Sequence, residues 1–402
     1  MALGNPVPSD YPALFRNYLK RATRSALQPP IPQDTFPQTG GYERTSQLIH
    51  TLTYALQSPD MWMEARDLLF SLSDTLERTA RHSDLIGLLE AGLRQSEAVA
   101  DLDTHALLQI RLALLILAQA ESDRAYALLH AAYHYFTGHH NALHQGEALN
   151  GLARWAIQRG ELSEATTFTE KALALLPADA MNEAGISHRL LGAIAVDRLA
   201  WEDAHTSYQQ SLHLWQRGNN LRFIGSGWAN VGSALRGLKR YDEAIAAFHE
   251  GIRRFETAQD LVNRAMVQMN LGNLHLQRHH YQAAIEQYHA AETVFRQLNR
   301  ISDLARLYNN WGMAYDGLAW REQAIRAYEQ SIGYWDTLQN SRMKANAQDN
   351  LGLVFFAMGR YAESAATYRK GLAALDGLEG SADSTLRALL LEHLAEAERR
   401  LG

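Results

Sequence analysis

The sequence predicts an all-α protein, built as a solenoid of stacked helix pairs. Three observations predict this class. Residues recur at a fixed spacing of forty positions, proline is almost absent after the first tenth of the chain, and alternating runs of Val, Ile and Thr are missing. A fixed period of this length is typical of stacked supersecondary units, and the missing alternation excludes most β architectures.

Proline usage divides the chain. Seven of the nine prolines precede residue 43, and only Pro59 and Pro177 follow. Proline removes a backbone donor and clashes with the preceding helical turn, so its near absence favours almost continuous helix and turn. We predict two domains: a Pro-rich N-terminal segment (1–42) with a short basic amphipathic helix, and a solenoid (43–402).

The N-terminal segment has its own pattern. Residues 11–27 set apolar side chains against basic ones, namely Leu14, Phe15, Tyr18 and Leu19 against Arg16, Lys20, Arg21 and Arg24. This pattern predicts a helix that contacts a membrane surface, a partner or its own solenoid. The following "QPPIPQDTFP" (28–37) predicts a stiff, polyproline-like connector.

Five units carry the repeat most clearly. Each has a glycine, a small residue twelve positions later, an aromatic residue four further on and another small residue three after that. The glycines are Gly192, Gly232, Gly272, Gly312 and Gly352, and the aromatic residues are Tyr208, Phe248, Tyr288, Tyr328 and Tyr368. Small residues let helices approach closely, and we expect the aromatic ring to fill the gap between neighbouring pairs.

These residues resemble the tetratricopeptide repeat family. "YDEAIAAFHEGI" (241–252) and "YQAAIEQYHAAE" (281–292) are similar to its second helix, and "NLGNLHLQRHHY" (270–281) to the end of its first helix and the turn. The resemblance implies a right-handed superhelical solenoid of antiparallel helix pairs. Weaker matches upstream extend the array to about eight units. The eight units together span residues 66 to 381, and a capping helix is expected around 384–401. Residues 43–58 fit the second helix of a degenerate first cap.

The forty-residue unit is longer than the family's usual unit of about 34 residues. This long form resembles the arrays of kinesin light chains, of Leu-Gly-Asn repeat spindle-orientation proteins and of the sensor domains of some bacterial regulators. The family's closing proline occurs once, at Pro177, so we expect the second helix to run about one turn further elsewhere. The relatives bind peptides or proteins on their concave face, and the resemblance implies the same here.

Asparagine recurs two positions before four of the glycines, although Asn costs about 0.7 kcal/mol relative to Ala inside a helix. The resemblance places the first helix of each unit along the groove. These amides therefore bind the backbone of an extended ligand, or they bond a neighbouring helix or turn. The candidate peptide-binding residues are Asn230, Asn270, Asn273, Asn309, Asn310, Asn346, Asn350, Arg189 and Arg306.

Other side chains are expected beside these amides. Met266, Met269 and Met313 suit an adaptable peptide groove, with ordinary core packing as the alternative. Asp316 and Asp349 add negative charge, so the expected groove is mixed rather than purely basic.

Catalytic and metal-binding patterns are scarce. His130 and His134 are four apart, as are His140 and His144, with His139 beside them, and this spacing suits metal ligands. The chain has no Cys, and no carboxylate lies between His130 and His144, so we expect packed or solvated histidines, no metal and no cofactor. No phosphate loop or nucleophile elbow is present, so we expect no enzyme activity.

Composition limits the remaining classes. The net charge is −6 and there is no long basic run, which argues against a nucleic-acid partner. Apolar runs fall short of the roughly 18 residues of a membrane span, and no secretory signal pattern is found near the first residue. We therefore expect a cytoplasmic, non-enzymatic scaffold that takes an extended peptide or a partner's tail in its concave groove. The alternative is a ligand- or peptide-sensing regulatory module that acts through a partner. The sequence does not indicate the oligomeric state.

Overall fold

The computed structural model describes residues 11–27, 40–78, 81–117, 122–378 and 380–402, and every regular element in these ranges is a helix. The predicted all-α class is therefore confirmed. The chain divides into two compact units, residues 1–220 and 221–402, and each is described here by itself. The expected connector at 28–37 lies outside the described residues, and the boundary at residue 42 stays a prediction.

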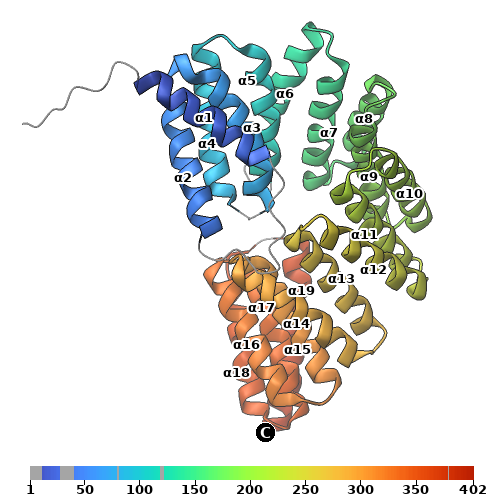
Figure 1. Cartoon of the computed structure of the whole chain (residues 1–402). Helices are drawn as coiled ribbons and strands as arrows, with labels where there is room; N and C mark the ends of the chain where they lie inside the picture. The colour runs from blue at the N-terminus through green and yellow to red at the C-terminus, as the bar shows by residue number, and fades with distance from the viewer. Residues whose placement is uncertain (1–10, 28–39, 79–80, 118–121, 379) are drawn as a thin grey trace, which may run out of the picture. The chain divides into compact units, whose positions relative to one another are not determined.

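The first unit consists of antiparallel helix pairs preceded by two single helices (Figure 1). Its elements are α1 (Tyr11–Leu27), α2 (Gly40–Ala55), a short 3-10 helix (Pro59–Met61), α3 (Trp62–Arg78), α4 (His82–Ala98), α5 (Leu102–Leu117), α6 (Ser122–Gly138), α7 (Ala142–Arg159), α8 (Leu162–Leu175), α9 (Met181–Asp197) and α10 (Trp201–Arg217).

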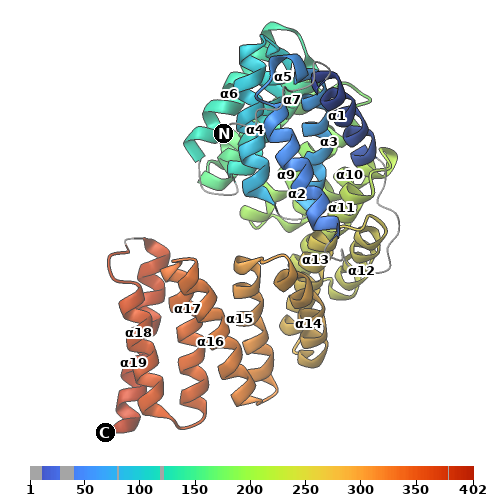
Figure 2. The ribbon, with the colours of Figure 1, turned by 60° about the vertical axis from the view of Figure 1, so that its left-hand side comes forward.

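The second unit continues the same plan and ends on a single helix. Its elements are α11 (Leu221–Gly237), α12 (Tyr241–Thr257), α13 (Leu261–Gln277), α14 (Tyr281–Gln297), α15 (Ile301–Gly317), α16 (Arg321–Thr337), α17 (Ser341–Ala357), α18 (Tyr361–Ala374) and α19 (Ser381–Leu401). Figure 2 shows α15 to α19 standing side by side. Consecutive helices pack on each other, and α11, α13, α15, α17 and α19 also make contact in order. The predicted solenoid of helix pairs is confirmed.

The forty-residue period comes from two half-repeats of equal length. Each helix from α11 to α16 has seventeen residues, and a residue with positive φ follows it two positions later. These residues recur every twenty positions, as Lys239, Gln259, His279, Asn299, Ala319 and Gln339. The next amide then bonds back over the helix end, as from Arg240 N–H to the carbonyl of Leu235 at 2.9 Å. This left-handed closure ends both helices of a pair alike. No proline is needed for it.

The repeated glycine and aromatic residues pack against each other within each pair. A Cβ on Gly312 of α15 would lie 2.7 Å from the ring of Tyr328 on α16, and Gly272 stands in the same relation to Tyr288. Tyr328 also belongs to one buried cluster with Leu351 of α17, so the ring faces the neighbouring pair as well. The ring needs the space that a missing Cβ leaves, so it lies over the glycine of its own first helix.

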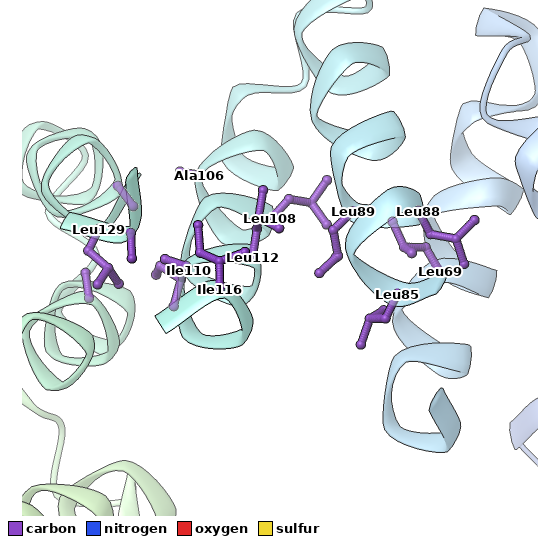
Figure 3. Packing of buried hydrophobic residues seen from close by; sticks show 14 of the residues in the cluster. Leu69, Leu85, Leu88, Leu89, Ala106, Leu108, Ile110, Leu112, Ile116 and Leu129 are labelled. Carbon is purple, nitrogen blue, oxygen red and sulfur yellow. The ribbon is translucent and has the colours of Figure 1, made fainter. Parts of the chain in front are cut away.

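Leucine dominates the core of the first unit. Figure 3 shows Leu69, Leu88 and Leu89 in a row with Leu108 and Leu112, which brings together α3, α4 and α5. All five side chains are buried. Because these positions are filled by leucine rather than by the glycine and aromatic pattern, the early units match the repeat weakly in sequence.

The N-terminal helix α1 packs on its own chain. Leu19 is fully buried, and α1 lies against α3. Arg16 donates a hydrogen bond of 2.5 Å to the carbonyl of Asp60, and Lys20 lies 3.5 Å from the carboxylate of Glu64. Of the three contacts considered for this basic helix, the structure shows the one with its own solenoid.

Candidate functional site

The candidate residues lie on the first helices of their pairs. Arg189 is on α9 in the first unit. In the second unit Asn230 is on α11, Asn270 and Asn273 on α13, Arg306, Asn309 and Asn310 on α15, and Asn346 and Asn350 on α17. Every asparagine among them is half-buried. Because α11, α13, α15 and α17 contact one another in order, these helices present a shared face within the second unit.

Four of the amides form a hydrogen-bonded chain across three helices. Asn350 Nδ2 donates to Asn309 Oδ1 at 3.1 Å, and Asn309 Nδ2 donates to Asn310 Oδ1 at 3.4 Å. Asn310 Nδ2 donates to Asn273 Oδ1 at 2.8 Å, and this oxygen also accepts from the hydroxyl of Tyr288 at 2.8 Å. We call Asn273, Asn309, Asn310 and Asn350 the amide chain. It has a direction, with donors pointing from α17 towards α13.

The amide chain leaves one unused group at each end. Asn350 Oδ1 accepts no hydrogen bond, and Asn273 Nδ2 donates none, within the described residues. Neither atom is sealed from solvent. The chain thus offers an acceptor on α17 and a donor on α13, and each amide nitrogen within it has a second proton. A peptide backbone, which carries both a donor and an acceptor at each residue, is complementary to this arrangement.

The remaining candidates in the second unit stand outside the amide chain. Asn270 and Asn346 make no side-chain hydrogen bond within the described part of the chain, and Asn230 Nδ2 is buried without a partner there. Arg306 pairs with the buried Asp303 at 2.5 Å. This ion pair holds the guanidinium of the exposed Arg306 to its own helix, so Arg306 is less available than the sequence suggested.

The expected methionines and acids take different places. Met269 is buried in the core and Met266 packs against the same cluster, whereas Met313 is exposed on α15. Asp316 is paired with Arg321, and Asp349 of α17 lies 2.7 Å from His393 of α19. Both carboxylates therefore bond to neighbouring side chains.

Sequence reasoning selected Arg189 in the first unit and missed Arg154 on α7, which stands on the helix that contacts α9. Burial, followed by the positive charge of Arg154, lowers the pKa of Arg189 to about 10. Burial also lowers the pKa of Arg154. Two positions in the sequence could have pointed to Arg154. Asn150 lies one repeat before Arg189 in the register of the first helices, and Arg154 follows Asn150 by one helical turn.

The histidines do not gather into a metal centre. His130 and His134 are exposed, with their Nε2 atoms 3.2 Å apart. His139 Nδ1 lies 2.8 Å from the carbonyl of Tyr135, and His144 Nδ1 lies 2.8 Å from Glu147. Within the described ranges no group of three or more His, Asp or Glu side chains is arranged to hold a metal ion. In the same ranges, no helix combines the length and apolar character that a membrane crossing requires.

Comparisons with known proteins agree with this architecture. A sequence profile described as a tetratricopeptide repeat matches residues 226–256 and 305–334. No curated protein matches the chain. Among solved structures, a signal-transduction ATPase with a tetratricopeptide repeat sensor from Pyrococcus horikoshii aligns with a TM-score of 0.63 and 14% identity, over 96% of this chain and 55% of the other.

Two further solved structures share the fold. Aspartyl phosphate phosphatase F from Bacillus subtilis aligns with a TM-score of 0.53 and 13% identity, over 94% of this chain and 97% of the other. The apo form of the quorum sensor NprR from B. thuringiensis aligns with a TM-score of 0.52 and 14% identity, over 74% and 81%. At these identities the likeness shows the fold alone. The chain thus carries two matched tetratricopeptide repeats within a fold that these solved structures share.

Proposed function

We propose that this protein is a non-enzymatic binding scaffold that takes an extended peptide or a partner's tail along the first helices of its pairs. The observation that carries the proposal is the amide chain, whose free acceptor on Asn350 and free donor on Asn273 match the two polar groups of a peptide backbone. These amides hold one another in place before a ligand arrives, so less side-chain entropy is lost on binding.

A second candidate function is peptide or ligand sensing. Two of the similar structures are named as sensors, the NprR quorum sensor and the tetratricopeptide repeat sensor of the Pyrococcus ATPase. Sensing needs two states of different ligand affinity. The contacts between the first helices of neighbouring pairs are places where the geometry of two such states can differ. A ligand-dependent change in the radius of gyration, measured by small-angle X-ray scattering, would favour sensing. An unchanged radius would favour a rigid scaffold.

The test of binding uses selection from a random peptide display library on the intact chain. Selected peptides are then titrated calorimetrically against wild type, against the Asn309→Ala, Asn310→Ala double variant and against Gln297→Ala. Gln297 is an exposed amide on α14 and serves as the matched control. We expect the double variant to lose roughly tenfold or more in affinity and the control to lose none. Selected peptides that bind the double variant as tightly as wild type would place the binding surface elsewhere.

A further inference from the structure

A cavity of about 600 Å³ lies in the first unit, between α2 and α4. Ile49 and Thr53 of α2 and the adjoining Leu56 line one side, and residues between Ser83 and Gln95 of α4 line the other. None of the lining residues is among the candidate peptide-binding residues. The volume is within the usual range of small-molecule sites, roughly 300–1,000 Å³. The cavity therefore has room for a small ligand.

The cavity is elongated along α4. Its first and last lining residues on this helix, Ser83 and Gln95, are twelve positions apart, which corresponds to roughly 18 Å along the helix axis. At the Ser83 end, Arg81 donates a hydrogen bond of 3.0 Å to the hydroxyl of Ser46, so α2 and the start of α4 are tied together there. A compact molecule would leave much of this length empty, whereas an extended one would fill it.

The middle of the cavity is apolar. Leu56 and Leu88 both line it, and both are buried. Gly87 also lines it, and a Cβ added to this glycine would meet no atom within 4 Å, so the missing side chain leaves the space open. An aliphatic chain placed here would remove apolar surface from water on both sides, which favours its binding.

Gln95 supplies a polar group at the far end. Its side chain is only 8% exposed, and its Nε2 is buried with no hydrogen-bond partner among the described residues. A buried donor that makes no hydrogen bond is unfavourable, and a ligand oxygen beside it would remove this penalty. Gln95 follows Leu88 by seven residues, so the amide and the apolar middle lie along one face of α4.

The charged side chains around the cavity do not require a charged ligand. Asp84 lines the cavity, but Arg81 lies 2.6 Å from its carboxylate and neutralises it. Arg94 is exposed to solvent, where water and salt screen its charge. A neutral molecule with a hydrogen-bond acceptor is therefore a better match than an ion.

We propose that this cavity binds a small neutral amphiphile, an unbranched aliphatic chain that carries an amide or ester carbonyl. The chain lies along Leu56 and Leu88, and the carbonyl oxygen accepts a hydrogen bond from Gln95 Nε2. The proposal does not depend on peptide binding, because it concerns another ligand class and a different unit from the amide chain.

The test titrates three small probes into the intact chain. N-methyloctanamide combines the chain with the carbonyl, N-methylacetamide has the carbonyl without the chain, and octylammonium has the chain with a positive charge in place of the carbonyl. Binding is followed by thermal shift and by the leucine methyl signals in 1H–13C correlation spectra. We expect N-methyloctanamide to bind, and the other two probes to bind about tenfold more weakly or less.

Two variants separate ligand binding from folding. Gly87→Leu fills the cavity and Gln95→Leu removes the donor, so each should weaken the binding of N-methyloctanamide about tenfold or more. Without ligand neither should lower the melting temperature, because leucine is a better helix former than glycine and Gln95→Leu removes an unpartnered buried donor. Gly333→Leu on α16 is the matched control, since a Cβ there also meets no atom within 4 Å. It should leave binding unchanged.

The proposal is wrong if N-methyloctanamide does not bind, if it binds no better than N-methylacetamide, or if both cavity variants bind it as tightly as wild type. Tighter binding of octanoate would also contradict it, because the cavity would then select an anion at Arg94. So would tighter binding of acetyl-leucine methylamide, which would assign the cavity to a peptide side chain. A clear loss of stability in Gln95→Leu without ligand would show that the amide has a structural role instead.

Discussion

Asn310 on α15 donates a hydrogen bond of 2.8 Å to the side-chain oxygen of Asn273 on α13, so one helix pair is joined to the next through two amides. The sequence left two roles open for these asparagines, a ligand contact or a bond to a neighbouring helix. The structure shows the second directly. Both residues are half-buried, and the amide chain has an unused group at each end, so a ligand can still contact these amides.

The first prediction separates the two roles at Asn310. Asn310→Ala removes the bond to Asn273 and the longer bond from Asn309, each worth about 0.5–1.5 kcal/mol net, and gains about 0.7 kcal/mol of helix propensity. We therefore expect the free energy of unfolding to fall by no more than about 2 kcal/mol, while peptide affinity falls. Urea denaturation and calorimetric titration of the same sample measure both quantities. Loss of stability with unchanged affinity would leave the amide chain as a purely structural feature.

The second prediction concerns the space over the glycines. Gly312→Ala places a methyl group 2.7 Å from the Tyr328 ring, and we expect it to destabilise the fold by about 1–3 kcal/mol. Gly333→Ala is the matched control, because a Cβ there has no neighbour within 4 Å. The control should stabilise the protein by roughly 0.5–1 kcal/mol through helix propensity. Equal effects of the two substitutions in chemical denaturation would contradict the packing described here.

The third prediction tests how α1 is held. Leu19 is fully buried, whereas Leu14 on the same helix is 62% exposed. Leu19→Ala should cost about 2–4 kcal/mol and Leu14→Ala less than about 0.5 kcal/mol. Hydrogen exchange should show the loss of protection in α1 and α3 while the second unit is unchanged, because repeat arrays are stabilised by nearest neighbours. Uniform loss of protection over the chain would indicate wider coupling.

The fourth prediction is a pH dependence at the end of the array. Burial raises the pKa of the Asp349 carboxyl, and His393 partly opposes this shift. A folded-state pKa above the unfolded value means that the contribution of Asp349 is fully present below the ordinary pKa and is lost as pH rises. Asp349→Asn should therefore gain stability relative to wild type between about pH 4 and pH 7. Urea denaturation across this range measures the difference, and a difference that moves the other way would show that the ion pair with His393 outweighs burial.

The fifth prediction concerns metal content. His130 and His134 are exposed neighbours without a third ligand in the described residues, and a stable zinc site needs three or four protein ligands. Elemental analysis of untagged protein should give less than about a tenth of an equivalent of zinc. A full equivalent that disappears in His130→Ala, His134→Ala would contradict this expectation.

The sequence alone determined the fold class and the repeat. A forty-residue period with small and aromatic residues at fixed offsets can be satisfied only by units that pack alike, so the helix pairs and the final helix α19 followed from local pattern. The ends of the second helices were harder to predict. Residues such as Gln259 and Gln339 carry no strong stop signal, and yet each takes the left-handed conformation after its helix.

Only the tertiary structure decided which polar side chains meet. The sequence placed Asn309, Asn310 and Asn350 among the candidates, but it could not show that they bond to one another, or that Arg306 is held by Asp303. Nor did it select Arg154. Position along a helix follows from periodicity, which is local, whereas the pairing of side chains on α13, α15 and α17, or on α7 and α9, depends on how far neighbouring helices are offset along their axes. That offset is set by packing between residues about forty positions apart in the sequence, and no single helix encodes it.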